Sequence, residues 1–147
     1  MELKDIASVS GKGGLFKVIK PTRSGVILES MDEKKSKLVA SVNNRISILE
    51  EISIYSHTPD GTTPLKDVLV NIHNEFGEDP GIDSGSSSEE LKAFLKHILP
   101  EYDEERVYVS DIKKVVSWYK IIFKYAPEIL QETKNEESQE DETKSES

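Results

Sequence analysis

The chain has 147 residues, with 28 acidic and 19 basic side chains, a net charge of −9 and no cysteine. Without cysteine, disulfides, thiolate metal sites and cysteine nucleophiles are excluded. The apolar runs are far shorter than the roughly 20 residues that span a bilayer, and the charged first residues do not resemble a secretory signal. We therefore expect a cytoplasmic protein with no membrane association.

The charge is unevenly distributed and divides the chain into three parts. Residues 1–57 carry nine basic and seven acidic residues, a net +2, whereas residues 58–130 carry −6 and residues 131–147 carry −5. We predict two small domains, at 1–57 and 58–130, followed by an acidic tail at 131–147. The tail has no apolar residue to offset the entropy of ordering, so we expect it to be disordered.

The first part reads as short strands separated by turns. We predict strands at 15–20, 26–31, 37–42, 46–48 and 52–54, with one helical turn at 49–51. So few strands cannot form two packed sheets, and a small curled barrel would bury their apolar face and limit open edges. A helical turn before the last strand is typical of SH3-like barrels, so we predict that the chain begins with a small SH3-like β-barrel. With the helices that follow, the predicted fold class is α+β.

The second part contains three stretches with the spacing of amphipathic helices. We expect the first helix to begin at Pro64, with Thr63 as its N-cap, and to end at Gly77. A capping box of Ser87 and Glu90 should open the second helix, which a proline ends after its last turn. These patterns predict a three-helix domain.

The third of these helices, expected from its cap Ser110 to residue 126, has an unusually wide apolar face. Trp118, Ile121 and Tyr125 lie beside its main stripe and widen the apolar arc to about 220°, against roughly 100° in an ordinary surface helix. The helix either packs centrally against the other helices and the barrel, or it presents these three residues as a protein interface, where aromatic side chains are enriched.

Residues 10–14 read Ser-Gly-Lys-Gly-Gly, which invites comparison with a phosphate-binding loop because backbone N–H groups of glycine-rich turns hold phosphate. A P-loop follows a strand and opens a helix, whereas this run precedes the strand predicted from Leu15. We therefore interpret it as a turn whose glycines allow positive φ.

Other candidate chemistry is weak. Residues 79–90 have the length of an EF-hand loop, but Gly81 occupies position 3 and the required glycine at position 6 is missing. The three histidines lack the spacing of metal ligands, and no carboxylate pair has a setting that would separate an acid from a base. We identify no catalytic, cofactor-binding or metal-binding residues and expect no cofactor.

Seven basic residues on the predicted strands and hairpin tips are candidates for contacting nucleic acid. They are Lys17, Lys20, Arg23, Lys34, Lys35, Lys37 and Arg45. Interleaved acids dilute their field, and Phe16 and Tyr55 are the only aromatic residues of this part that could stack on bases. A protein partner, or plain solvation of these side chains, is therefore favoured over nucleic acid.

Several runs resemble an uncharacterised family of small cytoplasmic proteins from Bacteroidetes. In the first part they are LKDI at 3–6, SGKGGLFK at 10–17, SMDEKK at 30–35 and EISIY at 51–55. In the second part SSSEELK at 86–92, LPEYD at 99–103 and RVYVSDIKKVVSWY at 106–119 resemble the partner domain that accompanies it. The resemblance implies two adjacent domains of unknown function and carries no catalytic or ligand residues.

The sequence therefore favours a non-enzymatic intracellular binding or adaptor protein with an unknown protein partner. Two alternatives stay open: an RNA- or ribosome-associated factor that uses the basic residues of the barrel, and an enzyme with a site at the junction of the two domains. The sequence predicts no oligomeric state.

Overall fold

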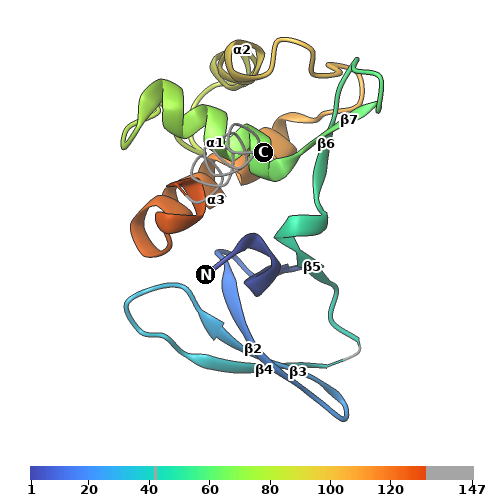
Figure 1. Cartoon of the computed structure of the whole chain (residues 1–147), viewed down its shortest axis with the longest axis vertical. Helices are drawn as coiled ribbons and strands as arrows, with labels where there is room; N and C mark the ends of the chain where they lie inside the picture. The colour runs from blue at the N-terminus through green and yellow to red at the C-terminus, as the bar shows by residue number, and fades with distance from the viewer. Residues whose placement is uncertain (42, 132–147) are drawn as a thin grey trace, which may run out of the picture.

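The computed structural model describes residues 1–41 and 43–131, which form a mixed α+β fold (Figure 1). The α+β prediction is thereby confirmed. From residue 132 onward, the predicted acidic tail lies outside the described residues. Within the described ranges, no helix has both the length and the apolar character needed to cross a membrane.

Residues 3–41 and 43–51 form a five-stranded antiparallel sheet with a short 3-10 helix before its first strand and another after its last. The elements are η1 (Leu3–Asp5), β1 (Ile6–Val9), β2 (Phe16–Thr22), β3 (Gly25–Ser30), β4 (Lys37–Ser41), β5 (Ile46–Ile48) and η2 (Leu49–Glu51). The strand order is β4-β3-β2-β1-β5, so the last strand returns to pair with the first. The sequence did not predict β1, because Ile6, Ala7 and Val9 are all buried and the strand lacks the alternation of a half-exposed one.

The closed barrel expected from the sequence is not found among the described residues, where the sheet is open with β4 and β5 at its edges. The strand expected to complete the barrel is β6 (Ser53–Tyr55), which pairs instead with β7 (Thr62–Pro64). Ile54 lies opposite Thr63 in this second, two-stranded sheet. Because β6 finds its partner further along the chain, it is not available to close the first sheet.

Three helices follow: α1 (Leu65–Phe76), α2 (Ser88–Ile98) and α3 (Val109–Tyr125), and residues 128–131 are also helical. The predicted capping box is confirmed, since the Ser87 N–H donates to Glu90 Oε1 at 2.9 Å and the Glu90 N–H donates to Ser87 Oγ at 3.2 Å. Gly77 ends α1 at a φ of 61°, as predicted.

Two predicted caps are wrong. Thr63 does not cap α1, because it pairs with β6 as part of β7, and α1 begins one residue after Pro64. Ser110 lies inside α3, whose first turn is capped by the Asp111 carboxylate that accepts the Tyr108 N–H at 3.0 Å. At the start of α1 no side chain acts as a cap, and the Leu65 N–H donates to the Ile52 carbonyl at 2.9 Å instead.

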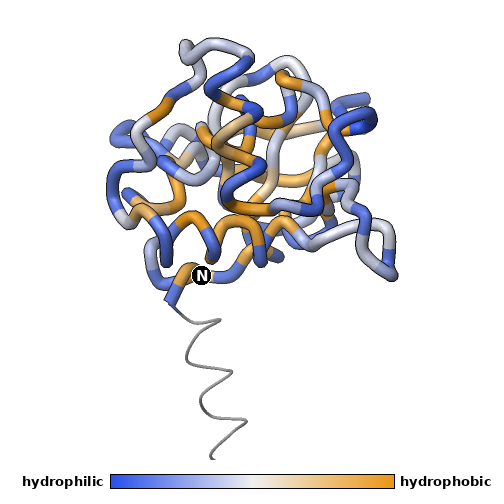
Figure 2. The backbone as a smooth tube through the Cα atoms, turned by 90° about the horizontal axis from the view of Figure 1, so that it is seen from above, coloured by the Kyte–Doolittle hydropathy of each residue, from blue (hydrophilic) through white to orange (hydrophobic). Residues whose placement is uncertain are grey.

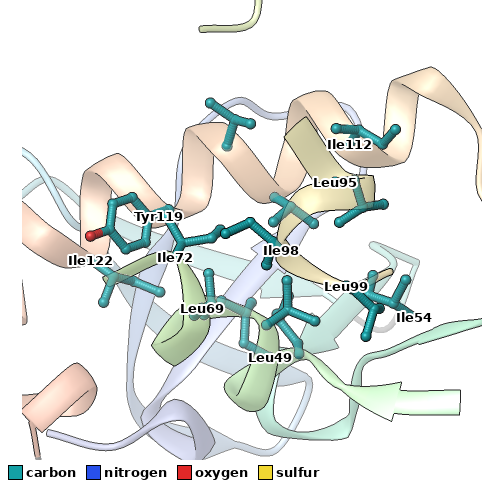
Figure 3. Close-up of a cluster of buried hydrophobic side chains, with 14 of the residues drawn as sticks. Leu49, Ile54, Leu69, Ile72, Leu95, Ile98, Leu99, Ile112, Tyr119 and Ile122 are labelled. Atoms are coloured by element: carbon teal, nitrogen blue, oxygen red, sulfur yellow. The ribbon is translucent and has the colours of Figure 1, made fainter. Parts of the chain in front are cut away.

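One hydrophobic core joins the sheet to the helices. Figure 3 shows Ile72, Leu95 and Tyr119 from the three helices converging with Leu49 of η2 and Ile54 of β6. A smaller cluster within the sheet is formed by Val9, Phe16, Leu28 and Ala40. In Figure 2, hydrophobic and hydrophilic positions alternate along the helical coils, as expected for helices that bury one face. The α3 helix is therefore fixed relative to the sheet by shared packing.

Candidate functional site: a basic groove between the sheet and α3

A groove of about 680 Å³ lies between the five-stranded sheet and α3. One side is formed by the end of β1, the loop at residues 10–14 and the start of β5, and the other by residues 111–118 of α3. Residues 52–55 and Val107 complete the lining. The groove is thus built from both halves of the chain, at the junction that the enzyme hypothesis requires.

Four basic side chains line this groove: Lys12 from the glycine-rich loop, Arg45 beside β5, and Lys113 and Lys114 from α3. All four are exposed, and within the described residues none of them forms an ion pair. Asp111 is the one acidic residue of the lining, and its carboxylate is engaged in capping α3. The groove therefore concentrates positive charge on a chain whose net charge is −9.

The glycine-rich loop is the turn that the sequence predicted. Gly11 and Gly14 have φ values of 84° and 78°, which confirms the expected positive φ at these two positions. The Ser10 N–H donates to the Arg45 carbonyl at 2.9 Å, and the Lys12 N–H donates to the Val9 carbonyl at 3.0 Å. These two bonds hold the loop against the strand ends that form the wall of the groove.

Two aromatic side chains also line the groove. Trp118 on α3 is half-buried and packs against the core, whereas Tyr55 of β6 is 48% exposed. The Arg106 guanidinium lies 5.4 Å from the centre of the Tyr55 ring, and the Asp103 N–H donates to the Tyr55 carbonyl at 2.9 Å. The loop after α2 thus contacts Tyr55 through both its ring and its backbone.

Of the seven basic residues singled out in the sequence, only Arg45 lines the groove. Lys17 and Lys37 lie on either side of Glu29 across three strands, and Lys37 Nζ contacts the Glu29 carboxylate at 2.7 Å. The hydrogen bond and charge of Lys37 lower the pKa of Glu29. Glu29 thus offsets part of the positive charge of Lys17 and Lys37, as the sequence suggested.

The other four predicted basic residues lie at the two ends of the hairpins. Lys20 and Arg23 are on β2 and its turn, while the backbone N–H groups of Lys34 and Lys35 each donate to the Asp32 carboxylate at 3.0 Å. The Ser30 hydroxyl and these two N–H groups lower the pKa of Asp32. The nucleic-acid role of the seven residues stays a prediction, but they do not gather in this groove.

The predicted interface strip of Trp118, Ile121 and Tyr125 is half-buried along its length, and all three residues pack against the core. Lys124 Nζ lies 5.3 Å from the centre of the Tyr125 ring. Of the strip, only Trp118 lines the groove. An interface role for the strip stays a prediction, and the structure shows that α3 packs centrally against its neighbours.

Sequence reasoning missed the contribution of Lys12, Lys113 and Lys114. The glycines around Lys12 were recognised as a turn, but neither Lys12 nor the two lysines of α3 were singled out as candidate binding residues. Because these residues are about 100 positions apart in the chain, only the packing of α3 against the sheet brings them together. No local pattern marks such a site.

Two family models match this chain, each described as a domain of unknown function: DUF5606 over residues 3–49 and DUF6852 over residues 52–122. A solution NMR structure of a protein from Bacteroides vulgatus, a structural-genomics target, is similar with a TM-score of 0.63 and 33% identity. The match covers 82% of this chain and 84% of that one. No curated protein matches. The chain therefore belongs to an uncharacterised Bacteroidetes family, whose two adjacent domains of unknown function it carries.

Proposed function

We propose that this protein is a non-enzymatic binding protein of the cytoplasm and that the groove between the sheet and α3 binds an anionic group of its partner. The observation that carries the proposal is the set of four cations, Lys12, Arg45, Lys113 and Lys114, around a cavity of about 680 Å³. The chain as a whole has a net charge of −9, so an anionic partner gains most where four cations line one cavity.

The order of strands β4-β3-β2-β1-β5 supports a binding module. The return of the last strand beside the first is compatible with the SH3-like comparison, although the sheet of the described residues is open. In this proposal the sheet supplies a rigid wall and α3 supplies the opposite one. Their shared core fixes the spacing of the two walls that carry the cations before the partner arrives, which reduces the entropy lost on binding.

The composition of the groove favours binding over catalysis. An enzyme at this junction would need a nucleophile with a base, or two titratable groups with separate roles. Among the described residues that line the groove, Asp111 is the one carboxylate, no histidine is present, and Asp111 caps α3. We therefore assign the groove to recognition.

The test uses the single tryptophan of the chain, Trp118, as a reporter inside the groove. Tripolyphosphate is titrated into the protein at low salt while the fluorescence of Trp118 is recorded. The variant K12Q/K113Q/K114Q removes three groove cations, and K20Q/R23Q/K34Q removes three exposed cations outside it. We expect binding that the groove variant weakens about tenfold or more and the control variant leaves nearly unchanged.

Two results would overturn the proposal. If the wild-type protein shows no fluorescence change and no calorimetric signal with tripolyphosphate at low salt, the groove does not bind anions. If both triple variants lose affinity equally, binding depends on total charge and not on this site. Circular dichroism of each variant checks that its fold is retained.

A further inference from the structure

We infer that the ligand of the groove is a nucleoside phosphate, with its phosphate at the loop of residues 10–14 and its base against an aromatic side chain. This inference rests on the proposed function and names the class of anion that the groove recognises. It depends on three features that meet in the groove: open backbone N–H groups, unpaired cations and exposed aromatic rings.

The phosphate end is defined by the glycine-rich loop. Among the described residues, the backbone N–H groups of Gly11, Gly13 and Gly14 have no protein acceptor, unlike those of Ser10 and Lys12. A Cβ built on any of these three glycines would meet no heavy atom within 4 Å. The loop backbone is therefore open to an oxyanion, which can approach it as closely as glycine allows.

Cations line the groove from both of its walls. Lys12 belongs to the loop itself, and Arg45 is held beside it by the bond between the Ser10 N–H and the Arg45 carbonyl. Lys113 and Lys114 approach from α3 on the opposite wall. An arginine fork combined with lysine point charges suits a di- or triphosphate, whose oxygens extend in several directions.

The base end is defined by Trp118 and Tyr55. Both rings line the groove and retain exposed surface, and Val9, Ile54 and Val115 add apolar residues to its lining. A base stacks on such a ring whatever its identity, because every base has a π face. An acidic peptide would use the cations and leave these rings without a planar partner, so the combination favours a nucleoside phosphate.

The size of the groove agrees with this ligand. Its volume of about 680 Å³ lies within the range of about 300–1,000 Å³ that small-molecule sites occupy. A free nucleotide and a nucleotide unit of a short single-stranded RNA present the same phosphate and base to it. The experiment therefore includes both sources.

The experiment titrates the full-length protein with ATP, tripolyphosphate, an RNA hexanucleotide and a glutamate-rich peptide, and follows Trp118 by fluorescence and by its indole N–H resonance. The Y55L variant removes one exposed ring, and Y108L removes a ring that is 68% exposed but outside the groove. We expect ATP or the hexanucleotide to bind about tenfold more tightly than tripolyphosphate. Y55L should weaken that binding severalfold, and Y108L should leave it unchanged.

The relative affinities of the four probes identify the ligand class. Tighter binding of ATP than of the hexanucleotide identifies a free nucleotide, and the reverse order identifies RNA. If tripolyphosphate binds as tightly as both, or the peptide binds and the nucleotides do not, the nucleoside phosphate is overturned while the anion-binding groove stands. If none of the four probes binds at low salt, the inference and the proposed function both fail.

Discussion

The backbone N–H of Ser10 donates a hydrogen bond to the backbone carbonyl of Arg45 across 2.9 Å. Ser10 opens the glycine-rich loop, and Arg45 directly precedes β5, whose Ile46 lies opposite Val9 of β1. One bond thus joins the loop that carries Lys12 to the strand end that carries Arg45. The conformation of the loop and the position of two groove cations are therefore coupled.

Replacing Gly14 with alanine should lower the free energy of unfolding by about 1 kcal/mol. Gly14 has a φ of 78°, and a residue with a Cβ pays roughly 1–2 kcal/mol in the left-handed region. The space around the position is open, so no clash adds to this penalty. Urea-induced unfolding at pH 7 measures the difference.

Gly13 provides the matched control one residue earlier. Its φ is not positive, and a Cβ there also meets open space. Gly13→Ala should therefore be neutral, or stabilise the protein by up to about 1 kcal/mol because alanine lowers the conformational entropy of the unfolded chain. Equal losses in the two variants would contradict this account of the loop.

The Tyr119→Phe variant should lose about 1 kcal/mol of stability at neutral pH. The Tyr119 side chain is fully buried, and its hydroxyl donates to the Gly77 carbonyl at the end of α1, which joins α3 to α1. Removing the hydroxyl leaves that carbonyl without this donor. Tyr108→Phe, at a residue that is 68% exposed, should change stability by much less.

The same variant should alter the response to alkaline pH. Burial raises the pKa of Tyr119 from its ordinary value of 10.0 to about 12. Because the folded state holds this proton more tightly than the unfolded state, the stabilisation is complete below pH 10 and is lost as the pH rises towards 12. Between these values, the wild-type protein should lose stability faster than Tyr119→Phe. Parallel unfolding curves for both proteins would show that Tyr119 does not titrate in this way.

The sequence predicted helix ends and turns correctly where residues close together in the chain determine them. The capping box of Ser87 and Glu90 and the helix end at Gly77 are set by neighbours within a few residues, and both were predicted correctly. The strands β2 to β5 were also located, within about two residues at each end. Turns and helix caps depend on residues that are close in the chain, so they can be predicted from the sequence.

The pairing of β6 and the basic groove were not readable, because both depend on distant segments. From its neighbours alone, Thr63 resembles a helix N-cap. In the fold it pairs with Ile54 of β6, and this strand pairing overrides the modest preference of threonine for the N-cap position. Lys12 and Lys113 become neighbours of one cavity only through the shared core. Sequence patterns indicate which face of a helix or strand is buried and where the element ends. They do not indicate which elements lie side by side in the fold.

Replacing Asp111 with asparagine should increase the affinity of the groove for tripolyphosphate severalfold at low salt. The change removes the one negative charge of the lining, while the asparagine oxygen can still accept the Tyr108 N–H that caps α3. Asp67→Asn is the matched control, because Asp67 lies in the first turn of α1 and outside the groove. Both variants lose a favourable charge at a helix start, so both should be slightly less stable. An equal gain in affinity would assign the effect to net charge.

Removing residues 132–147 should also strengthen anion binding, but only at low salt. These residues carry a net charge of −5, so the truncated chain has a net charge of −4 instead of −9. A less negative chain repels an approaching anion less, and this long-range effect is screened within about 8 Å at physiological ionic strength. A full-length variant with five of the seven tail acids changed to glutamine or asparagine also has a net charge of −4, because two acids and the two tail lysines remain, and it separates charge from length. We expect it to match the truncated chain in tripolyphosphate titrations at 20 mM salt, and all three proteins to converge at 300 mM. An affinity difference that persists at high salt would show that the tail acts on the groove by a route other than its charge.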